Sequence, residues 1–163
     1  MTAQLRPASA DDAAFLAEML FEAFAWQGAP DDLDLDGLRL RPEIWHYVEG
    51  WPRAGDGGRV AEVDGQPVAA AWWRTFDGAD RGYGFVSAEV PELSMGVAPT
   101  HRGQGLGGVL LDTLVADARA ADLPGLSLSV EDGNDRARAL YERRGFVVVG
   151  RDGDSDTMLL RLP

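Results

Sequence analysis

The sequence predicts an α/β fold of the α+β type, in which helices flank one mixed, mostly antiparallel sheet. Three observations predict it: helix-like segments come first, strand-like segments joined by a tight turn follow, and alternating strand and helix patterns close the chain. The chain has 163 residues, of which 45% are hydrophobic, which suits one domain with a single core. We therefore expect residues 1–163 to form a single domain.

The first half of the chain is predicted to form helices over residues 10–25 and 43–51 and strands over 59–63 and 67–76. Ser9 is placed to cap the first helix, and apolar residues recur behind it at helical spacing. An acidic stretch over residues 31–37 separates the two helices as a loop. Asp64 and Gly65 are a strong signal for a hairpin, so the two strands are expected to pair antiparallel.

The second half is predicted to form strands over residues 92–97, 126–130, 146–149 and 158–162 and helices over 106–118 and 134–144. In strand 92–97 apolar residues alternate with Glu92, Ser94 and Gly96, so one face is expected on the core and the other at a cleft. Asn134 is placed to cap the last helix, and Gly145 to end it.

Charge and composition exclude several classes of function. The net charge of −12 repels nucleic acid and anionic membranes and favours cationic partners. The sequence has no cysteine, which excludes disulfides, thiolate metal ligands and a thioester intermediate on the protein. No targeting or membrane-spanning pattern is visible, which favours a cytoplasmic protein.

A glycine-rich loop stands between strand 92–97 and the helix that follows it. The loop consists of Arg102, Gly103, Gln104, Gly105, Leu106, Gly107 and Gly108. Backbone N–H groups converge at such a helix N-terminus, and glycines let a ligand oxygen approach them because no Cβ intervenes. Arg102 adds a charge-assisted donor, so the loop predicts a phosphate site.

Two other phosphate motifs compete for this loop. Gly103, Gly105 and Gly108 satisfy the dinucleotide pattern G-x-G-x-x-G, and the acidic pair Glu131-Asp132 follows the next strand. However, a dinucleotide loop follows its strand at once in the first βα unit, whereas five residues intervene here. A P-loop is excluded because no Lys-Ser or Lys-Thr follows the glycines.

Two motifs in this order resemble those of the GCN5-related N-acetyltransferase (GNAT) family. The first runs from the Glu-Leu-x-x-x-Val-x-Pro pattern at Glu92 into Arg102-Gly103-Gln104-Gly105-Leu106-Gly107, which is similar to the R/Q-x-x-G-x-G/A loop. The second, Asn134, Ala137, Tyr141 and Gly145-Phe146, is similar to the family's N-x-x-A-x-x-x-Y-x-x-x-G-F segment. The close resemblance covers residues 92–149.

The resemblance implies the acyl-CoA N-acyltransferase fold, whose fourth and fifth strands splay apart around acetyl-CoA. It implies that Met95, Gly96 and Val97 hold the pantetheine and acetyl group and that residues 102–108 hold the pyrophosphate. Gly96 departs from the bulkier residue often found there, which would either widen the cleft or let the thioester approach more closely.

The resemblance also implies catalytic roles. Asn134 and Tyr141 lie at helical spacing on one face, and the matching tyrosine of the family is a general acid that protonates the leaving thiolate. Apart from the resemblance, an attacking amine must lose its proton to a base. Glu92 is the candidate because it lies on the cleft-facing side of its strand, and Glu89 is the alternative if Pro91 marks a bulge. A water chain is the remaining possibility.

The sequence therefore predicts an N-acetyltransferase, a monomer or homodimer, that passes acetyl from acetyl-CoA directly to a cationic amine. The alternatives are an acetyl-CoA sensor without turnover and an NAD-dependent enzyme. Acceptor specificity is assigned to the N-terminal helices and residues 77–86, which carry no motif. No metal is expected, although Asp32, Asp34, Asp36, Gly37 and Glu43 satisfy a calcium-loop pattern. The plainer interpretation is an acidic loop between helices.

Overall fold

The computed structural model describes residues 2–28 and 32–163, so Asp31 of the predicted acidic loop lies outside the described residues. The chain divides into two compact units, one comprising Met1–Trp72 and Ser94–Leu114 and the other Trp73–Leu93 and Val115–Pro163.

Within the described residues, seven strands form one mixed sheet in the order β1-β2-β3-β4-β5-β7-β6. The strands are β1 (Gln4–Pro7), β2 (Gly57–Val63), β3 (Gln66–Arg74), β4 (Glu92–Val97), β5 (Gly125–Glu131), β6 (Val147–Asp152) and β7 (Ser155–Arg161). The helices are α1 (Ala13–Phe24), α2 (Leu35–Arg39), α3 (Pro42–Trp45), α4 (Leu106–Ala120) and α5 (Asp135–Glu142), with 3₁₀ turns η1 (Ala10–Asp12) and η2 (Pro99–His101). β4 runs parallel to β5, and β7 antiparallel to it. The predicted α/β fold with a mixed sheet is confirmed.

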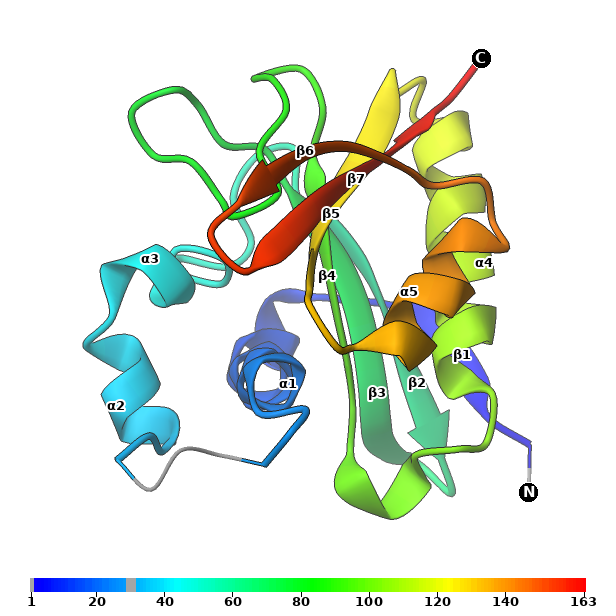
Figure 1. Cartoon of the computed structure of the whole chain (residues 1–163). Helices are drawn as coiled ribbons and strands as arrows, with labels where there is room; N and C mark the ends of the chain where they lie inside the picture. The colour runs from blue at the N-terminus through cyan, green and yellow to red at the C-terminus, as the bar shows by residue number, and fades with distance from the viewer. Residues whose placement is uncertain (1, 29–31) are drawn as a thin grey trace. The chain divides into compact units, whose positions relative to one another are not determined.

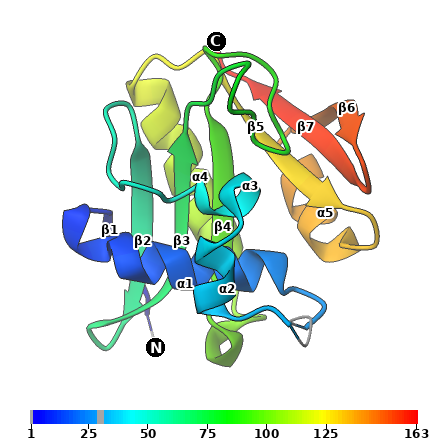
Figure 2. The same ribbon diagram turned by 90° about the vertical axis from the view of Figure 1, so that its left-hand side faces the viewer.

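In the first unit α1 crosses one face of strands β2 and β3 (Figure 2). Its apolar stripe, which includes Leu16 and Leu20, is buried, as the spacing predicts. Asp64 and Gly65 have φ of 53° and 76° between β2 and β3, which is the backbone of a two-residue hairpin turn. The predicted helix after Ser9 and the predicted hairpin are therefore confirmed.

The structure differs from the sequence-based predictions at three places in the first unit. Strand β1, which was not among the predicted elements, pairs antiparallel with β2 and places Leu5 opposite Ala61. The predicted loop at residues 31–37 contains the start of α2, because the Asp34 side chain accepts a hydrogen bond from the Gly37 N–H at 2.7 Å and caps that helix. The predicted helix over residues 43–51 shortens to α3, and residues 46–50 continue as turns.

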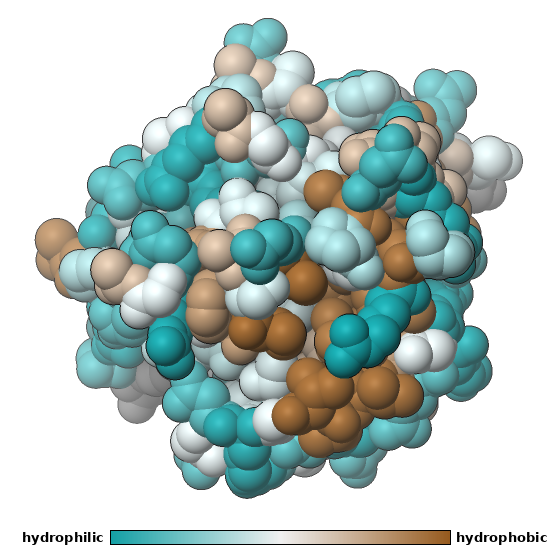
Figure 3. Space-filling model, turned by 90° about the horizontal axis from the view of Figure 1, so that it is seen from above, coloured by the Kyte–Doolittle hydropathy of each residue, from teal (hydrophilic) through white to brown (hydrophobic). Residues whose placement is uncertain are grey.

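The second unit contains the hairpin of β6 and β7, which lies beside α5 (Figure 1). Leu126, Leu128 and Met158 of β5 and β7 are buried, whereas every residue of β6 is exposed. Val147, Val148 and Val149 of β6 are 58%, 50% and 46% exposed. Hydrophobic residues also reach the surface in the view of Figure 3, among mostly hydrophilic ones. No helix within the described residues combines the length and apolar character needed to cross a bilayer.

Candidate active site

The glycine loop leads from η2 into α4. Gly103 and Gly105 have φ of 76° and 80°, backbone conformations that side chains with a Cβ rarely adopt. Gly103, Gln104 and Gly105 are exposed, and the space where a Cβ of Gly105 would lie holds no atom within 4 Å. The first turn of a helix has N–H groups without helical partners, and its dipole favours an anion. The loop therefore fits a pyrophosphate group.

Arg102 at the head of this loop is bound to α1. Its Nη2 donates to Glu22 Oε2 at 2.7 Å, and its Nε donates to the Val97 carbonyl at 3.3 Å. The side chains of Arg102 and Glu22 are 41% and 21% exposed, so ligands in solution can still reach the guanidinium. Glu22 was not predicted as a partner of Arg102, from which it lies 80 positions away in the sequence.

The predicted pantetheine strand is β4, in which Met95 and Val97 are half-buried and Gly96 is buried. A Cβ at Gly96 would lie 2.9 Å from the carbonyl carbon of Met19 in α1, which is closer than real Cβ atoms approach backbone. The absent side chain of Gly96 thus lets α1 pack against β4. That packing is one structural reason for the glycine at this position.

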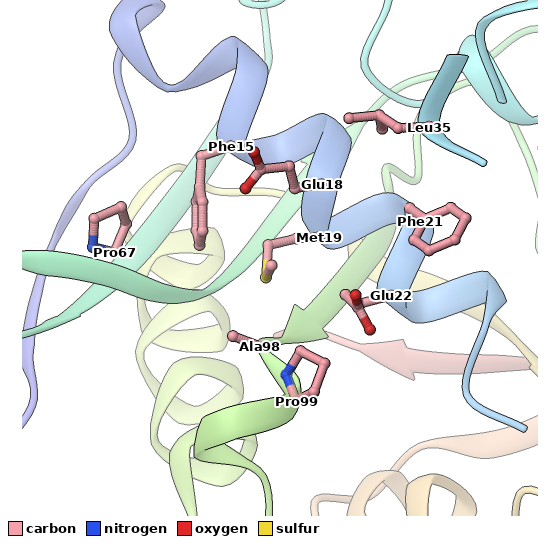
Figure 4. Close-up of a pocket in the computed structure, with 9 residues that line it drawn as sticks. All are labelled: Phe15, Glu18, Met19, Phe21, Glu22, Leu35, Pro67, Ala98 and Pro99. Carbon is pink, nitrogen blue, oxygen red and sulfur yellow. The ribbon is translucent and has the colours of Figure 1, made fainter. Parts of the chain in front are cut away.

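A pocket of about 280 Å³ lies beside this contact (Figure 4). It is lined by Phe15, Glu18, Met19, Phe21 and Glu22 of α1, Leu35 of α2, Pro67 of β3, and Ala98 and Pro99 after β4. Acceptor specificity was assigned to the N-terminal helices as a whole, but none of these residues was named individually from the sequence as a site residue. Phe15, Glu18, Met19 and Glu22 do follow helical spacing on one face of α1, which is the signal by which the sequence could have revealed them.

Glu92, the predicted base, begins β4 and lies opposite Ser127 of β5. It is 3% exposed, whereas the alternation in β4 predicted a cleft-facing side chain. Its Oε1 accepts a hydrogen bond from the Gly84 N–H at 2.7 Å, so the segment between β3 and β4 covers it. The alternative base, Glu89, is exposed and precedes β4 in a turn.

Tyr141 and Asn134 belong to α5 and its N-cap. The Asn134 side chain accepts a hydrogen bond from the Ala137 N–H at 3.4 Å, as expected of a cap. Tyr141 is buried, and its ring packs against that of Phe146 with centroids 5.8 Å apart. Burial raises the pKa of the Tyr141 phenol to about 12, so the phenol keeps its proton at neutral pH.

An ion-pair network holds α5 to the last hairpin. Arg138 of α5 binds Asp156 of β7 at 2.8 Å, and Arg151 of β6 binds both Asp156 and Asp132 at 3.0 Å. The Arg138 guanidinium, with that of Arg151, lowers the pKa of Asp156, and Arg151 lowers the pKa of Asp132. Asp132 is one of the acidic pair that a dinucleotide site would use for ribose, and here it pairs with an arginine.

The calcium-loop pattern does not correspond to a calcium loop in the structure. Asp34 caps α2, and Asp36 and Gly37 lie inside that helix. Across residues 2–28 and 32–163, no group of three or more His, Asp or Glu side chains is placed to hold a metal ion.

Residues 16–146 match the model of the acetyltransferase (GNAT) family. The chain belongs to the GNAT acetyltransferase family. The predicted resemblance is confirmed, and acetyl-CoA is the acyl donor that members of this family use. Arg102, Gly103, Gln104 and Gly105 of the predicted phosphate loop are exposed, whereas Leu106 is buried in the first turn of α4.

Curated and solved GNAT proteins resemble the chain along most of its length. A mycothiol acetyltransferase from Acidimicrobium ferrooxidans is 35% identical over 97% of this chain but only 46% of the relative, so the chain spans about half of that protein. A putative acetyltransferase from Salmonella typhimurium, solved with acetyl-CoA, has a TM-score of 0.67 and 24% identity, covering 100% of this chain and 95% of that one. The PaiA N-acetyltransferase from Thermoplasma acidophilum, solved with coenzyme A, has a TM-score of 0.71 and 18% identity, covering 99% and 100% of the two chains. These two solved structures support the GNAT fold.

Proposed function

We propose that this chain transfers the acetyl group of acetyl-CoA directly to an amine, without a covalent intermediate on the protein. The observation that carries the proposal is the exposed glycine loop at the start of α4 in a chain of the GNAT family. Bound acetyl-CoA supplies a thioester, whose acetyl carbon an amine can attack and whose thiol can leave. The chain has no cysteine that could take the acetyl group first.

The binding roles follow the family motifs. The N–H groups of residues 102–108 and the Arg102 guanidinium bind the pyrophosphate, and the backbone of Met95, Gly96 and Val97 binds the pantetheine. By the same family motifs, a cofactor-binding role is proposed for Asn134, the N-cap residue of α5. We also propose that residues 1–163 function as one N-acetyltransferase domain, so a single cooperative unfolding transition is expected.

Glu92 is the proposed base, because a carboxylate can accept the proton that the amine must lose. Its hydrogen bond from Gly84 fixes the side chain at the start of β4. The proton path must pass the segment that covers Glu92, by way of an ordered water or a movement of residues 77–91.

Tyr141 is proposed to assist the leaving thiol. A pKa of about 12 makes the phenol a weaker acid than a thiol of pKa ~8.5, so full proton transfer to a thiolate is uphill by roughly 5 kcal/mol. We therefore assign Tyr141 the role of a hydrogen-bond donor to the leaving sulfur. The proton that ends on the thiol then originates from the amine.

A thiol-release assay with acetyl-CoA and a panel of amines tests the proposal. Release that depends on the amine, with an acetylated amine identified by mass spectrometry, is the expected result. Calorimetric binding of CoA without acceptor-dependent release would instead support an acetyl-CoA sensor. Competition between NADH and CoA for the protein would support the dinucleotide alternative.

The acceptor of the mycothiol acetyltransferases belongs in this panel, because the chain is 35% identical to one of them over 97% of its length. Amines with a second cationic group, such as polyamines, belong there too, since the net charge is −12.

A further inference from the structure

Glu22 takes part in two features of the first unit at once. Its carboxylate holds Arg102 of the glycine loop at 2.7 Å, and its side chain lines the pocket between α1, α2 and the end of β4. Figure 4 shows Glu22 pointing from α1 towards Pro99, at the side of the pocket where the chain leaves β4. The charge that the pocket presents is therefore linked to what Arg102 binds.

We propose that the pocket binds the ammonium group of an amine and that cofactor binding switches this site on. When a pyrophosphate takes the donors of Arg102, the Glu22 carboxylate loses its partner and becomes available to a cation in the pocket. The inference rests on the proposed function in one respect, which is that residues 102–108 bind the pyrophosphate.

The lining of the pocket suits a small organic cation. Phe15, Phe21 and Leu35 are half-buried and supply apolar surface, while Glu18 adds a second carboxylate one helical turn from Glu22. Like charges four residues apart on a helix repel each other, so a nearby cation is favoured, and aromatic faces also attract ammonium groups. A volume of about 280 Å³ is at the low end for ligand pockets, so it holds a small amine or one end of a larger one.

Charge favours the replacement of the Glu22 carboxylate by a pyrophosphate as the partner of Arg102. A pyrophosphate offers several anionic oxygens, and it also bonds to the N–H groups at the start of α4, whereas Glu22 offers one carboxylate. The Arg102–Glu22 pair is partly exposed and therefore weak enough to be displaced. Because coupling between two sites is reciprocal, an ammonium ion in the pocket must also strengthen cofactor binding.

The first test measures CoA binding by isothermal titration calorimetry in the whole chain and two matched variants. Glu22→Gln removes the competitor of the pyrophosphate, so CoA should bind about two- to five-fold more tightly, the range expected of an exposed ion pair. Glu18→Gln removes the same charge from the same pocket without touching Arg102, and it should leave CoA binding nearly unchanged. Equal effects of the two variants, or no effect of either, would overturn the proposal.

The second test measures binding of 2-phenylethylammonium with and without saturating CoA, which carries no acetyl group and permits no turnover. CoA should tighten binding of this probe several-fold in the original chain and have no effect in Glu22→Gln. The neutral analogue 2-phenylethanol should show no such response. Failure of the ammonium to bind in the presence of CoA, or an unchanged CoA response in Glu22→Gln, would contradict the proposal.

These two measurements separate the inference from the proposed function. If CoA binds and the coupling is present but no amine is acetylated, the catalytic proposal fails and the ammonium site stands. If amines are acetylated but Glu22→Gln binds CoA and the probe as the original chain does, the ammonium switch fails and catalysis stands.

Discussion

Glu92 Oε1 accepts a hydrogen bond from the Gly84 N–H at 2.7 Å, which ties the segment between β3 and β4 to the first residue of β4. Gly84 itself lies against β5, because a Cβ there would be 2.6 Å from the Leu128 carbonyl oxygen. The proposed base is thus held by a loop that is itself fixed against the neighbouring strand, which links the stability of this region to the proton-transfer step.

Replacing Glu92 with Gln distinguishes its structural role, as acceptor of the Gly84 hydrogen bond, from its proposed role as the base. The amide oxygen can still accept the Gly84 hydrogen bond, so the melting temperature should change little, while loss of the base should lower kcat/KM about 10²- to 10⁴-fold. The pH–rate profile should also lose its acidic limb. Glu89→Gln, at an exposed position in the preceding turn, is the control. If only Glu89→Gln changes the profile, Glu89 is the base, and if neither does, a water chain is.

Replacing Gly84 with Ala should destabilise the second unit. The new Cβ would overlap the backbone of Leu128 and Ser129, which cannot move aside as a side-chain tip can, so a cost of about 1–3 kcal/mol in the free energy of unfolding is expected. Urea denaturation measures it. Gly78→Ala in the same loop is the matched control, since no atom lies within 4 Å of its Cβ position. Equal stability of the two variants would show that the loop shifts freely.

Replacing Gly96 with Ala should cost a similar amount of stability, here at the contact between β4 and α1. Its Cβ would meet the backbone of Met19, so α1 would have to move away from β4, and about 1–3 kcal/mol of stability should be lost. Gly150→Ala, where the nearest neighbour is the Thr157 Cβ at 3.8 Å, should be nearly neutral. Thermal unfolding of both variants decides whether α1 is fixed at this point.

The elements around the two family motifs could be predicted because their signals are local. Strand β4, helix α4 and the Asn134 cap each follow from alternation, helical spacing or a capping residue within a few positions. The short strand β1 gives no such signal, since four residues fit many patterns and its partner at Ala61 is far along the chain. The prediction of a helix over residues 43–51 was wrong beyond α3, where residues 46–50 form turns instead.

The candidate site was less predictable than the fold, because its decisive contacts join distant segments. Nothing local in β4 shows that Gly84 covers Glu92, since the segment between β3 and β4 has no periodicity. Likewise, Glu22 and Arg102 are 80 positions apart in the sequence, and only the folded chain brings them together as an ion pair. Residue types at the glycine loop indicate a phosphate site, but they do not show which carboxylate competes for it.

Replacing Tyr141 with Phe should lower the turnover number more than the affinity for acetyl-CoA. The ring keeps its packing against Phe146, so binding and folding should persist, while the hydrogen bond to the leaving sulfur is lost. A single such donor is expected to contribute up to about 10²- to 10³-fold in kcat. Steady-state kinetics together with calorimetric CoA binding separate the two quantities. An unchanged kcat would remove Tyr141 from catalysis.

The raised pKa of Tyr141 also predicts a loss of stability in alkali. In the unfolded chain the phenol ionises near pH 10, whereas burial in the folded chain delays ionisation to about pH 12. The stabilisation from the neutral phenol is therefore fully present below pH ~10 and is lost as the pH rises towards 12, by up to roughly 3 kcal/mol. Tyr141→Phe lacks this group, so the difference in unfolding free energy between the original chain and the variant should fall across that interval. Urea unfolding of both proteins from pH 8 to 12 measures this difference in unfolding free energy. If the difference stays constant, Tyr141 ionises as readily in the folded chain as in the unfolded one.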